Sequence, residues 1–273
     1  MATDPPEYAS ALLRATGTET LLVDDGFPAP GTGIEWAELG ELAGCASRPV
    51  MRIERVAEEA EDDPVEHVRE EVATARTNGF AGLKTIAAYR GGLDLDALPT
   101  STRTDRIEGT RLRDVLVAAL DANEQTGDPL TVQVHVGFGD SDLFLPLARP
   151  GYLKPLIERF WTTPFVLLHC YPFVREAGWL AHVYGNVWLD VSLTIPHVAR
   201  PDEMVKQALE LAPVSKLLYA SDAARTPELY YLAAKWSREA LADVLSEALP
   251  ADESEAAGRM ILRQNAIGLY RLP

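Results

Sequence analysis

The 273-residue chain contains only two cysteines, Cys45 and Cys170, and far fewer basic than acidic residues. Two cysteines cannot form a disulfide framework or a multi-cysteine zinc site, so a reducing cytoplasm is the expected location. The 25 lysines and arginines against 41 aspartates and glutamates leave a net charge of −16. Because a field of this sign repels phosphate, the composition argues against nucleic acid and anionic membranes as partners.

Long apolar runs are also absent. No stretch approaches the ~18 apolar residues of a membrane-spanning helix, and residues 1–7 have neither the basic nor the apolar region of a signal peptide. Hydrophobic residues make up 47% of the chain and charged residues 24%, which is an ordinary globular composition. Since no low-complexity linker divides the chain, we expect one domain over residues 1–273.

What the sequence contains instead is an alternation of short apolar runs with amphipathic segments. Seven runs, each closed by a polar or turn residue, are typical of buried parallel strands: 20–23, 50–53, 82–87, 130–136, 165–168, 187–191 and 216–220. Helix signals fill the intervals; for example, Asp63-Pro64 opens a helix that Gly79 closes. Further helices are expected at 8–15, 112–125, 226–241 and 251–270. This alternation predicts an α/β fold with a parallel sheet or barrel.

The spacing of the polar residues that close these runs favours a barrel. They follow one another at intervals of about 30 residues, as in a (β/α)8 barrel, apart from a longer interval that contains the insertion 91–108. Seven strands are present rather than eight, and the missing one would lie upstream of Met1. We therefore predict a (β/α)8 TIM-barrel type fold that lacks its first strand. The resulting gap would expose strand edges and apolar surface, so we also predict a homo-oligomer.

Three of the strand-end residues, His135, His169 and Asp222, form the strongest candidate site. In a barrel they would converge on one rim. Two imidazoles and a carboxylate suit a divalent metal, zinc first and manganese second, and leave a coordination position for water. The alternative is that two buried histidines close their strands and that Asp222 caps the next helix.

Five motifs in chain order carry a family resemblance. They are Gly82–Leu93 (GLKTIAAYRGGL), Gln133–Asp140 (QVHVGFGD), Leu167–Phe173 (LLHCYPF), Asn186–Ser192 (NVWLDVS) and Tyr219–Ala223 (YASDA). Together they resemble the amidohydrolase family related to the domain fused to glutamine-synthetase-like enzymes. The resemblance implies a metal-dependent TIM-barrel hydrolase. By position, His135 resembles the ligand of the fifth strand, His169 the histidine of the sixth and Asp222 the acid of the eighth.

The family also carries a His-x-His pair on its first strand, and this sequence contains no His-x-His. The other histidines do not replace the pair, because His67 and His182 fall in predicted helices and His197 falls in a loop. Three interpretations remain open. The chain is a shortened enzyme, or an inactive member with a binding or regulatory role, or one part of a barrel that a partner subunit completes.

The reaction implied by the resemblance is hydrolysis of a C–N bond in a small molecule. Asp222 would act as the base and later deliver the proton to the leaving amine. His169 would hold the metal or the developing oxyanion.

A basic rim suggests the kind of substrate. The basic residues Lys84, Arg90 and Arg175 fall near strand ends, with Tyr89 beside Arg90. Basic residues there, in so acidic a protein, favour a carboxylate-bearing compound. Lys84 has three interpretations: it pairs with Glu54 or Asp24, it binds the substrate carboxylate, or it is a carboxylated, metal-bridging lysine.

Two residues beside the candidate site are expected to be structural. Asp190 lies in an apolar strand, where burial requires a partner such as Ser192 or the backbone. Cys170 follows His169 directly, and adjacent strand residues point to opposite faces, so Cys170 is expected to pack rather than to act as a nucleophile.

Overall fold

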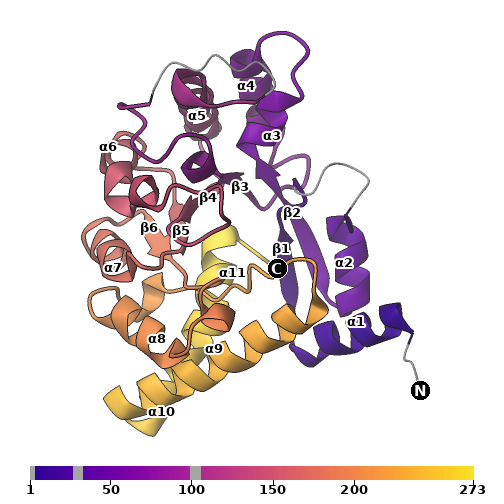
Figure 1. The fold of residues 1–273 in the computed structure, drawn as a ribbon, viewed down its shortest axis with the longest axis vertical. Coiled ribbons are helices and arrows are strands. Elements are labelled where there is room, and N and C mark those ends of the chain that lie inside the picture. Colours follow the sequence, from indigo (N-terminus) through magenta and orange to yellow (C-terminus); the bar gives the residue numbers. More distant parts are fainter. Residues whose placement is uncertain (1–3, 27–32, 99–105) are drawn as a thin grey trace.

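The computed structural model describes residues 4–26, 33–98 and 106–273. Six parallel strands form one sheet in chain order (Figure 1). They are β1 (Thr20–Val23), β2 (Ala46–Arg52), β3 (Gly82–Thr85), β4 (Thr131–Val136), β5 (Phe165–His169) and β6 (Val187–Leu189). The sheet curls into a half-barrel, which confirms the predicted barrel-type α/β fold and the first six predicted strands.

The prediction of a seventh strand at 216–220 is wrong. Residues Val214–Lys216 form a 3-10 turn, η5, and only Leu217 makes a bridge to Leu189. The Leu218 N–H donates to the Leu189 carbonyl at 2.9 Å, but the Tyr219 N–H donates to the Ile261 carbonyl at 3.2 Å. Because the backbone turns from β6 to the C-terminal segment within two residues, the ladder ends after one bridge.

Eleven helices surround the sheet in the described part of the chain, and most of them cover its convex face. They are α1 (Pro5–Ala15), α2 (Trp36–Ala43), α3 (Ile53–Glu58), α4 (Pro64–Thr74), α5 (Gly109–Gln125), α6 (Lys154–Arg159), α7 (Val174–Val183), α8 (Pro201–Leu209), α9 (Pro227–Ala248), α10 (Ala251–Arg259) and α11 (Asn265–Tyr270). As predicted, Asp63 caps α4, accepting from the Val65 N–H at 2.9 Å ahead of Pro64. The single helix expected at 251–270 is instead two helices joined by a π-helical segment, Met260–Gln264.

Alternation along the strands separates the core from the concave face. In β4, Val132, Val134 and Val136 belong to the main apolar core, which also contains residues of α3 to α9. His135 and Gln133 therefore point to the opposite, concave face. The same alternation places Lys84 of β3, which pairs with Gln133, on the concave face. His169 follows Leu168 at the end of β5, where a left-handed backbone (φ 67°) interrupts the alternation.

The C-terminal helix α11 covers the amino-terminal end of this concave face. Tyr270 is buried, and its hydroxyl accepts from the Gln133 amide at 3.0 Å. Its ring lies so close to Gly82 that a Cβ there would meet it at 3.3 Å. Tyr270 also packs in a small cluster with Val166 and Leu168 of β5. The base of the half-barrel is therefore closed, and the carboxyl ends of the strands remain for function.

Tyr270→Ala is expected to lower the free energy of unfolding by about 3–5 kcal/mol, because it removes a buried aromatic ring and leaves a cavity. Tyr270→Phe should cost only about 1 kcal/mol, the net value of one hydrogen bond. Urea unfolding followed by tryptophan fluorescence measures both. Equal stability of the two variants would show that α11 does not close the base.

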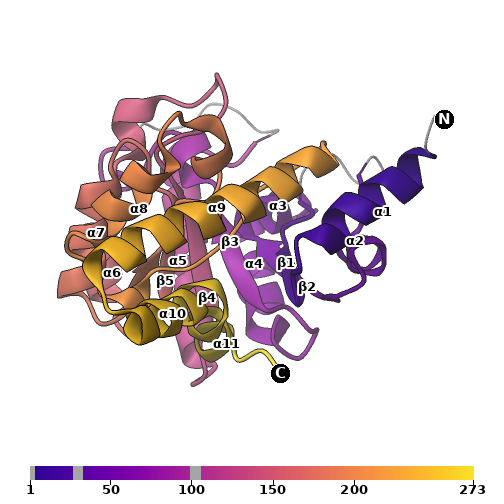
Figure 2. The same ribbon diagram turned by 90° about the horizontal axis from the view of Figure 1, so that it is seen from below.

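The long helix α9 spans the open side of the half-barrel, packed between α1 and α8 (Figure 2). The Tyr8 hydroxyl of α1 donates to Glu228 at 2.9 Å, and Arg238 donates to the Thr16 carbonyl. The open side of the half-barrel is thus partly covered by helices of the same chain. Self-association stays a prediction. No helix among the described residues is long and apolar enough to cross a membrane.

Candidate functional site

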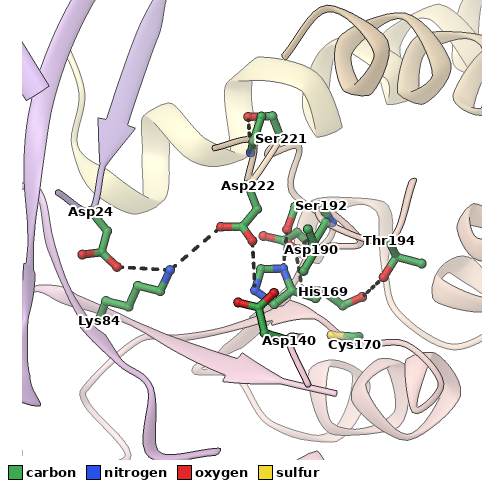
Figure 3. Close-up of polar contacts among 12 residues, drawn as sticks. Asp24, Lys84, Asp140, His169, Cys170, Asp190, Ser192, Thr194, Ser221 and Asp222 are labelled. Atoms are coloured by element: carbon green, nitrogen blue, oxygen red, sulfur yellow. Dashed lines mark hydrogen bonds and ion pairs between the residues drawn. The ribbon is translucent and has the colours of Figure 1, made fainter. Parts of the chain in front are cut away.

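Five polar side chains from strand ends, and a sixth from the segment after the Leu217 bridge, gather at the carboxyl edge of the sheet (Figure 3). They are Asp24 after β1, Lys84 in β3, His135 in β4, His169 at the end of β5, Asp190 after β6 and Asp222 beyond the Leu217 bridge. Catalytic groups of barrel enzymes occupy this edge. The structure therefore brings together the three residues predicted to bind a metal.

The two histidines lie side by side, with ring centroids 4.5 Å apart. Burial lowers the pKa of both imidazoles well below the usual 6.5, and the positive charge of Lys84 lowers it further. Both rings are therefore neutral at neutral pH. The Nε2 atom of each is buried without a hydrogen-bond partner in the part of the chain that the structure describes. An unpartnered buried nitrogen costs free energy, which marks both atoms as places where a ligand is expected.

His169 is held from several sides. Its Nδ1 lies 2.8 Å from the Ser192 hydroxyl, and its backbone N–H donates to Asp190 at 2.8 Å. The Thr194 hydroxyl donates to the His169 carbonyl at 3.1 Å. Asp190 also accepts from the Ser192 N–H at 3.0 Å, and burial raises the pKa of its carboxyl to about 6. These contacts confirm the structural role expected for Asp190 and fix the direction of Nε2.

The backbone is strained at the same place. His169, Cys170 and Asp222 have φ values of 67°, 63° and 46°, a left-handed conformation that residues other than glycine rarely adopt. Such strain concentrates at functional sites, where the surrounding structure maintains it. Cys170 itself is fully buried, and burial raises the pKa of its thiol well above the usual value, so it packs as expected.

A cationic group faces the histidines across Asp222. The Lys84 ammonium lies 3.2 Å from Asp24 Oδ2 and 4.0 Å from Asp222 Oδ1. Arg52 also binds Asp24, at 2.6 Å. Although burial alone would raise it, the charges of Lys84 and Arg52 hold the pKa of Asp24 below its ordinary value. The first interpretation of Lys84, a pair with Asp24, is therefore present, whereas Glu54 is bound instead by Thr85 and the Ile86 N–H.

The four residues predicted to bind substrate divide into two groups. Lys84 and Tyr89 join the site: the Tyr89 ring lies 4.7 Å from that of His135, and burial raises the pKa of its hydroxyl to about 12. Arg90 instead pairs with Glu58 of α3 at 2.9 Å. Arg175 lies exposed on α7 and pairs with Glu210 at 2.7 Å.

These ion pairs show where the arginines of the predicted basic rim point, and substrate binding by Arg90 and Arg175 stays a prediction. The guanidinium groups of Arg90 and Arg175 are directed to carboxylates of the chain, because each arginine lies beside a helix that presents a glutamate. Arg55 likewise pairs with Glu59 at 2.6 Å. Positions near strand ends predicted where these residues lie, but not where their side chains point.

A glycine that shapes the site is explained only by the structure. A Cβ at Gly139 would lie 2.9 Å from His135 Nε2 and would collide with the Tyr89 hydroxyl. The Asp140 N–H in the same loop donates to that hydroxyl at 3.0 Å. The sequence places Gly139 in a loop directly after a strand that carries a site histidine, but it does not reveal the contact with that histidine.

The donor set fits a metal in its chemistry. His169 Nε2 lies 3.6 Å from Asp222 Oδ2, close to the roughly 3.4 Å that separates two ligands of one tetrahedral zinc ion. Two neutral imidazoles and a carboxylate are zinc ligands. The geometry does not close, however: within residues 4–26, 33–98 and 106–273, no group of three His, Cys, Asp or Glu side chains is arranged to hold a metal.

The remaining histidines lie elsewhere, as predicted. His67 is on α4. His182 is on α7, with Nδ1 2.9 Å from the Leu211 carbonyl. His197 is in the 3-10 turn η4 (Ile195–His197) rather than a loop, with Nδ1 2.8 Å from the Leu193 carbonyl. None of these contacts reaches the His135–His169 pair.

Fold and site together define a barrel-type α/β protein whose reactive groups meet at the carboxyl ends of parallel strands. Residues 42–272 match the family described as amidohydrolase, and the chain belongs to the amidohydrolase family. It is 33% identical over 222 residues to Protein fluG of Emericella nidulans, a match that covers 70% of this chain and 25% of that protein. The chain therefore spans about a quarter of that relative's length.

A solved structure extends the likeness over nearly the whole chain. It is a protein of Lactobacillus casei ATCC 334 assigned as a metal-dependent hydrolase, with a TM-score of 0.87 and 30% sequence identity. The superposition covers 99% of this chain and 78% of that one. These comparisons confirm the family resemblance carried by the five motifs.

Proposed function

We propose that the protein is a metal-dependent hydrolase that cleaves a C–N bond in a small, carboxylate-bearing compound. One observation carries the proposal: two buried, neutral histidines present unpartnered Nε2 atoms beside the carboxylate of Asp222. Membership of the amidohydrolase family and the likeness to a protein assigned as a metal-dependent hydrolase support it.

The residues that would hold the metal are His135, His169 and Asp222, with zinc preferred and manganese the alternative. When bound, the ion would polarise the scissile carbonyl and lower the pKa of a water molecule. Asp222 is the proton carrier, because its side chain is one-third exposed and therefore reachable by water and substrate. It would accept the proton of the attacking water and then pass it to the leaving amine.

The carboxylate preference rests on Lys84. Its ammonium lies 4.0 Å from Asp222, close enough to attract an anionic group beside the scissile bond. Tyr89, protonated at neutral pH and next to His135, supplies a second group that can donate a hydrogen bond to substrate.

A second candidate function is binding without catalysis. It is favoured by the observation that no three potential ligands close around one point in the described part of the chain. In that case the half-barrel would bind a small molecule at the same edge, without a metal and without turnover.

Metal content distinguishes the two functions. We expect near-stoichiometric zinc or manganese in the purified chain by inductively coupled plasma mass spectrometry, and loss of it in the His135→Ala/Asp222→Ala variant. His67→Ala, on the outer helix α4, is the matched control and should keep the metal. Absence of metal from all three folded proteins would refute the hydrolase proposal and favour the binding role.

A further inference from the structure

Within the described residues, the loop after β4 presents a carboxylate that has no partner. The Asp140 side chain is exposed and forms neither an ion pair nor a hydrogen bond with another described residue. Figure 3 shows its carboxylate directed toward Asp222 and the His169 ring. Asp24, at the other side of the site, is instead neutralised by Lys84 at 3.2 Å. Asp140 is therefore a negative charge beside the candidate site that a ligand can reach.

The backbone holds this carboxylate in place. The Asp140 N–H donates to the Tyr89 hydroxyl at 3.0 Å. Two residues earlier, the Phe138 N–H donates to the Tyr171 carbonyl at 2.7 Å. The loop is thus fixed to the segments after β3 and after β5, so that little ordering is needed when a ligand binds.

A buried nitrogen without a partner faces the same loop. His135 is 5% exposed, and its Nε2 has no hydrogen-bond partner in the described part of the chain. A Cβ at Gly139 would lie 2.9 Å from this nitrogen, so His135 Nε2 is aimed at the backbone directly before Asp140. Because an unpartnered buried polar atom requires a ligand or water, this observation independently places a bound group next to Asp140.

Aromatic side chains border the carboxylate. The Phe138 ring lies edge-on to that of Tyr171, with centroids 6.3 Å apart, and Tyr171 is 40% exposed. Aromatic faces attract organic cations and pack against methylene groups. A carboxylate beside such rings suits an alkylammonium group, whose charge meets Asp140 and whose carbon chain lies along the rings.

The charge of the whole chain acts in the same direction. A net charge of −16 attracts cations to the surface and favours their encounter with an exposed carboxylate. The positive charge of Lys84 lies apart from Asp140, on the Asp24 side of the site (Figure 3). The edge therefore offers an attractive position for a carboxylate and a separate one for an ammonium group.

We propose that Asp140 is a specificity-determining residue that binds a protonated amino group of the substrate. The inference rests on the proposed function, which it deepens: the compound would be an aminoalkyl amide, with a carboxylate on its acyl part near Lys84 and an ammonium on its amine part near Asp140. Hydrolysis adds the hydroxyl of water to the acyl carbon and a proton to the nitrogen. The products are then a dicarboxylic acid and a diamine.

The test compares two ligands that differ only in the group that Asp140 would bind. N-(ω-aminobutyl)succinamate ends in an ammonium, and N-pentylsuccinamate has a methyl group in its place. Dissociation constants are measured by isothermal titration calorimetry with a chelator present, so that binding is measured without metal or turnover. We expect the natural chain to bind the aminobutyl compound at least about fivefold more tightly, the upper range for an exposed ion pair, and the preference to weaken with added salt.

Asp140→Asn should reduce this preference to less than about twofold, because it removes the charge but keeps the backbone N–H that binds Tyr89. Asp140→Glu keeps the charge and should retain part of the preference. Asp142→Asn is the matched control, since it removes a charge from another exposed position of the same loop, and it should bind both ligands as the natural chain does.

Three results would overturn the inference. They are equal binding of the two ligands by the natural chain, an undiminished preference in Asp140→Asn, and no binding of either ligand. None of them touches the proposed function, which is decided separately by metal content and by hydrolysis of either amide in the metal-loaded protein. Conversely, a preference that disappears only in Asp140→Asn, in a chain that hydrolyses neither amide, would support the ammonium site and leave the binding role as its function.

Discussion

Asp222→Asn is expected to reduce hydrolysis by about 10²–10⁴-fold, the usual contribution of a positioned acid–base group. The amide keeps the size of the carboxylate and an oxygen toward His169, but it cannot accept a proton at neutral pH. The loss should appear in kcat rather than KM, because the proton moves only during the reaction.

The measurement begins with a panel of N-acyl and glutamyl amides, from which a substrate of the natural chain is selected. Asp142→Asn is the matched control, since it removes the same charge from an exposed position in the loop after β4. It should change kcat/KM less than about threefold, as expected for an exposed charge. Full activity of Asp222→Asn would assign the proton transfer to another group.

The pH dependence of stability is the second large effect. In the presence of a chelator, the free energy of unfolding should fall as the pH is lowered from 7 to 5. The pKa values of His135 and His169 lie well below 6.5 in the folded protein, so the unfolded chain binds protons that the folded chain excludes. Their contribution is complete above pH ~6.5 and is lost below it, by up to about 1.4 kcal/mol per pH unit for each imidazole.

Asp190 acts in the opposite direction. Burial raises the pKa of its carboxyl from 3.8 to about 6, so the folded protein keeps a proton that the unfolded chain releases. This contribution is present below pH ~3.8 and is lost as the pH rises through 6. Between pH 5 and 6 the contribution of Asp190 cancels about that of one histidine. The free energy of unfolding therefore changes by about 1.4 kcal/mol per pH unit from the three groups together.

Urea unfolding at several pH values tests this balance. The His135→Gln/His169→Gln variant should lose the fall in stability toward pH 5, whereas Asp190→Asn should steepen it because the opposing group is gone. A slope that is the same in all three proteins would contradict neutral, buried histidines in the folded state.

Much of the fold followed from local patterns. Apolar runs and their closing residues predicted β1 to β6, and Asp63-Pro64 predicted the start of α4. Local patterns failed to predict the structure of residues 216–220. This segment has the composition of a strand, but its backbone is drawn to Ile261, more than 40 residues later, and local composition contains no information about that partner.

For the site, the residue types and their positions at strand ends were sufficient to predict that His135, His169, Lys84 and Asp222 lie close together. The sequence could not predict which charged side chains form ion pairs with other residues of the chain. Arg175 resembled a site residue by position, yet Glu210, directly after α8, binds it. Side-chain direction depends on neighbours that only packing supplies.

The sequence by itself determined the order of strands and helices, the edge of the sheet where the polar groups lie, and the family. These properties depend on short-range patterns and on motifs of a few residues. Tertiary structure alone decided that α11 closes the base through Tyr270 and Gln133. It also decided that Asp222 stands between Lys84 and His169, because that position depends on contacts between segments far apart in the chain.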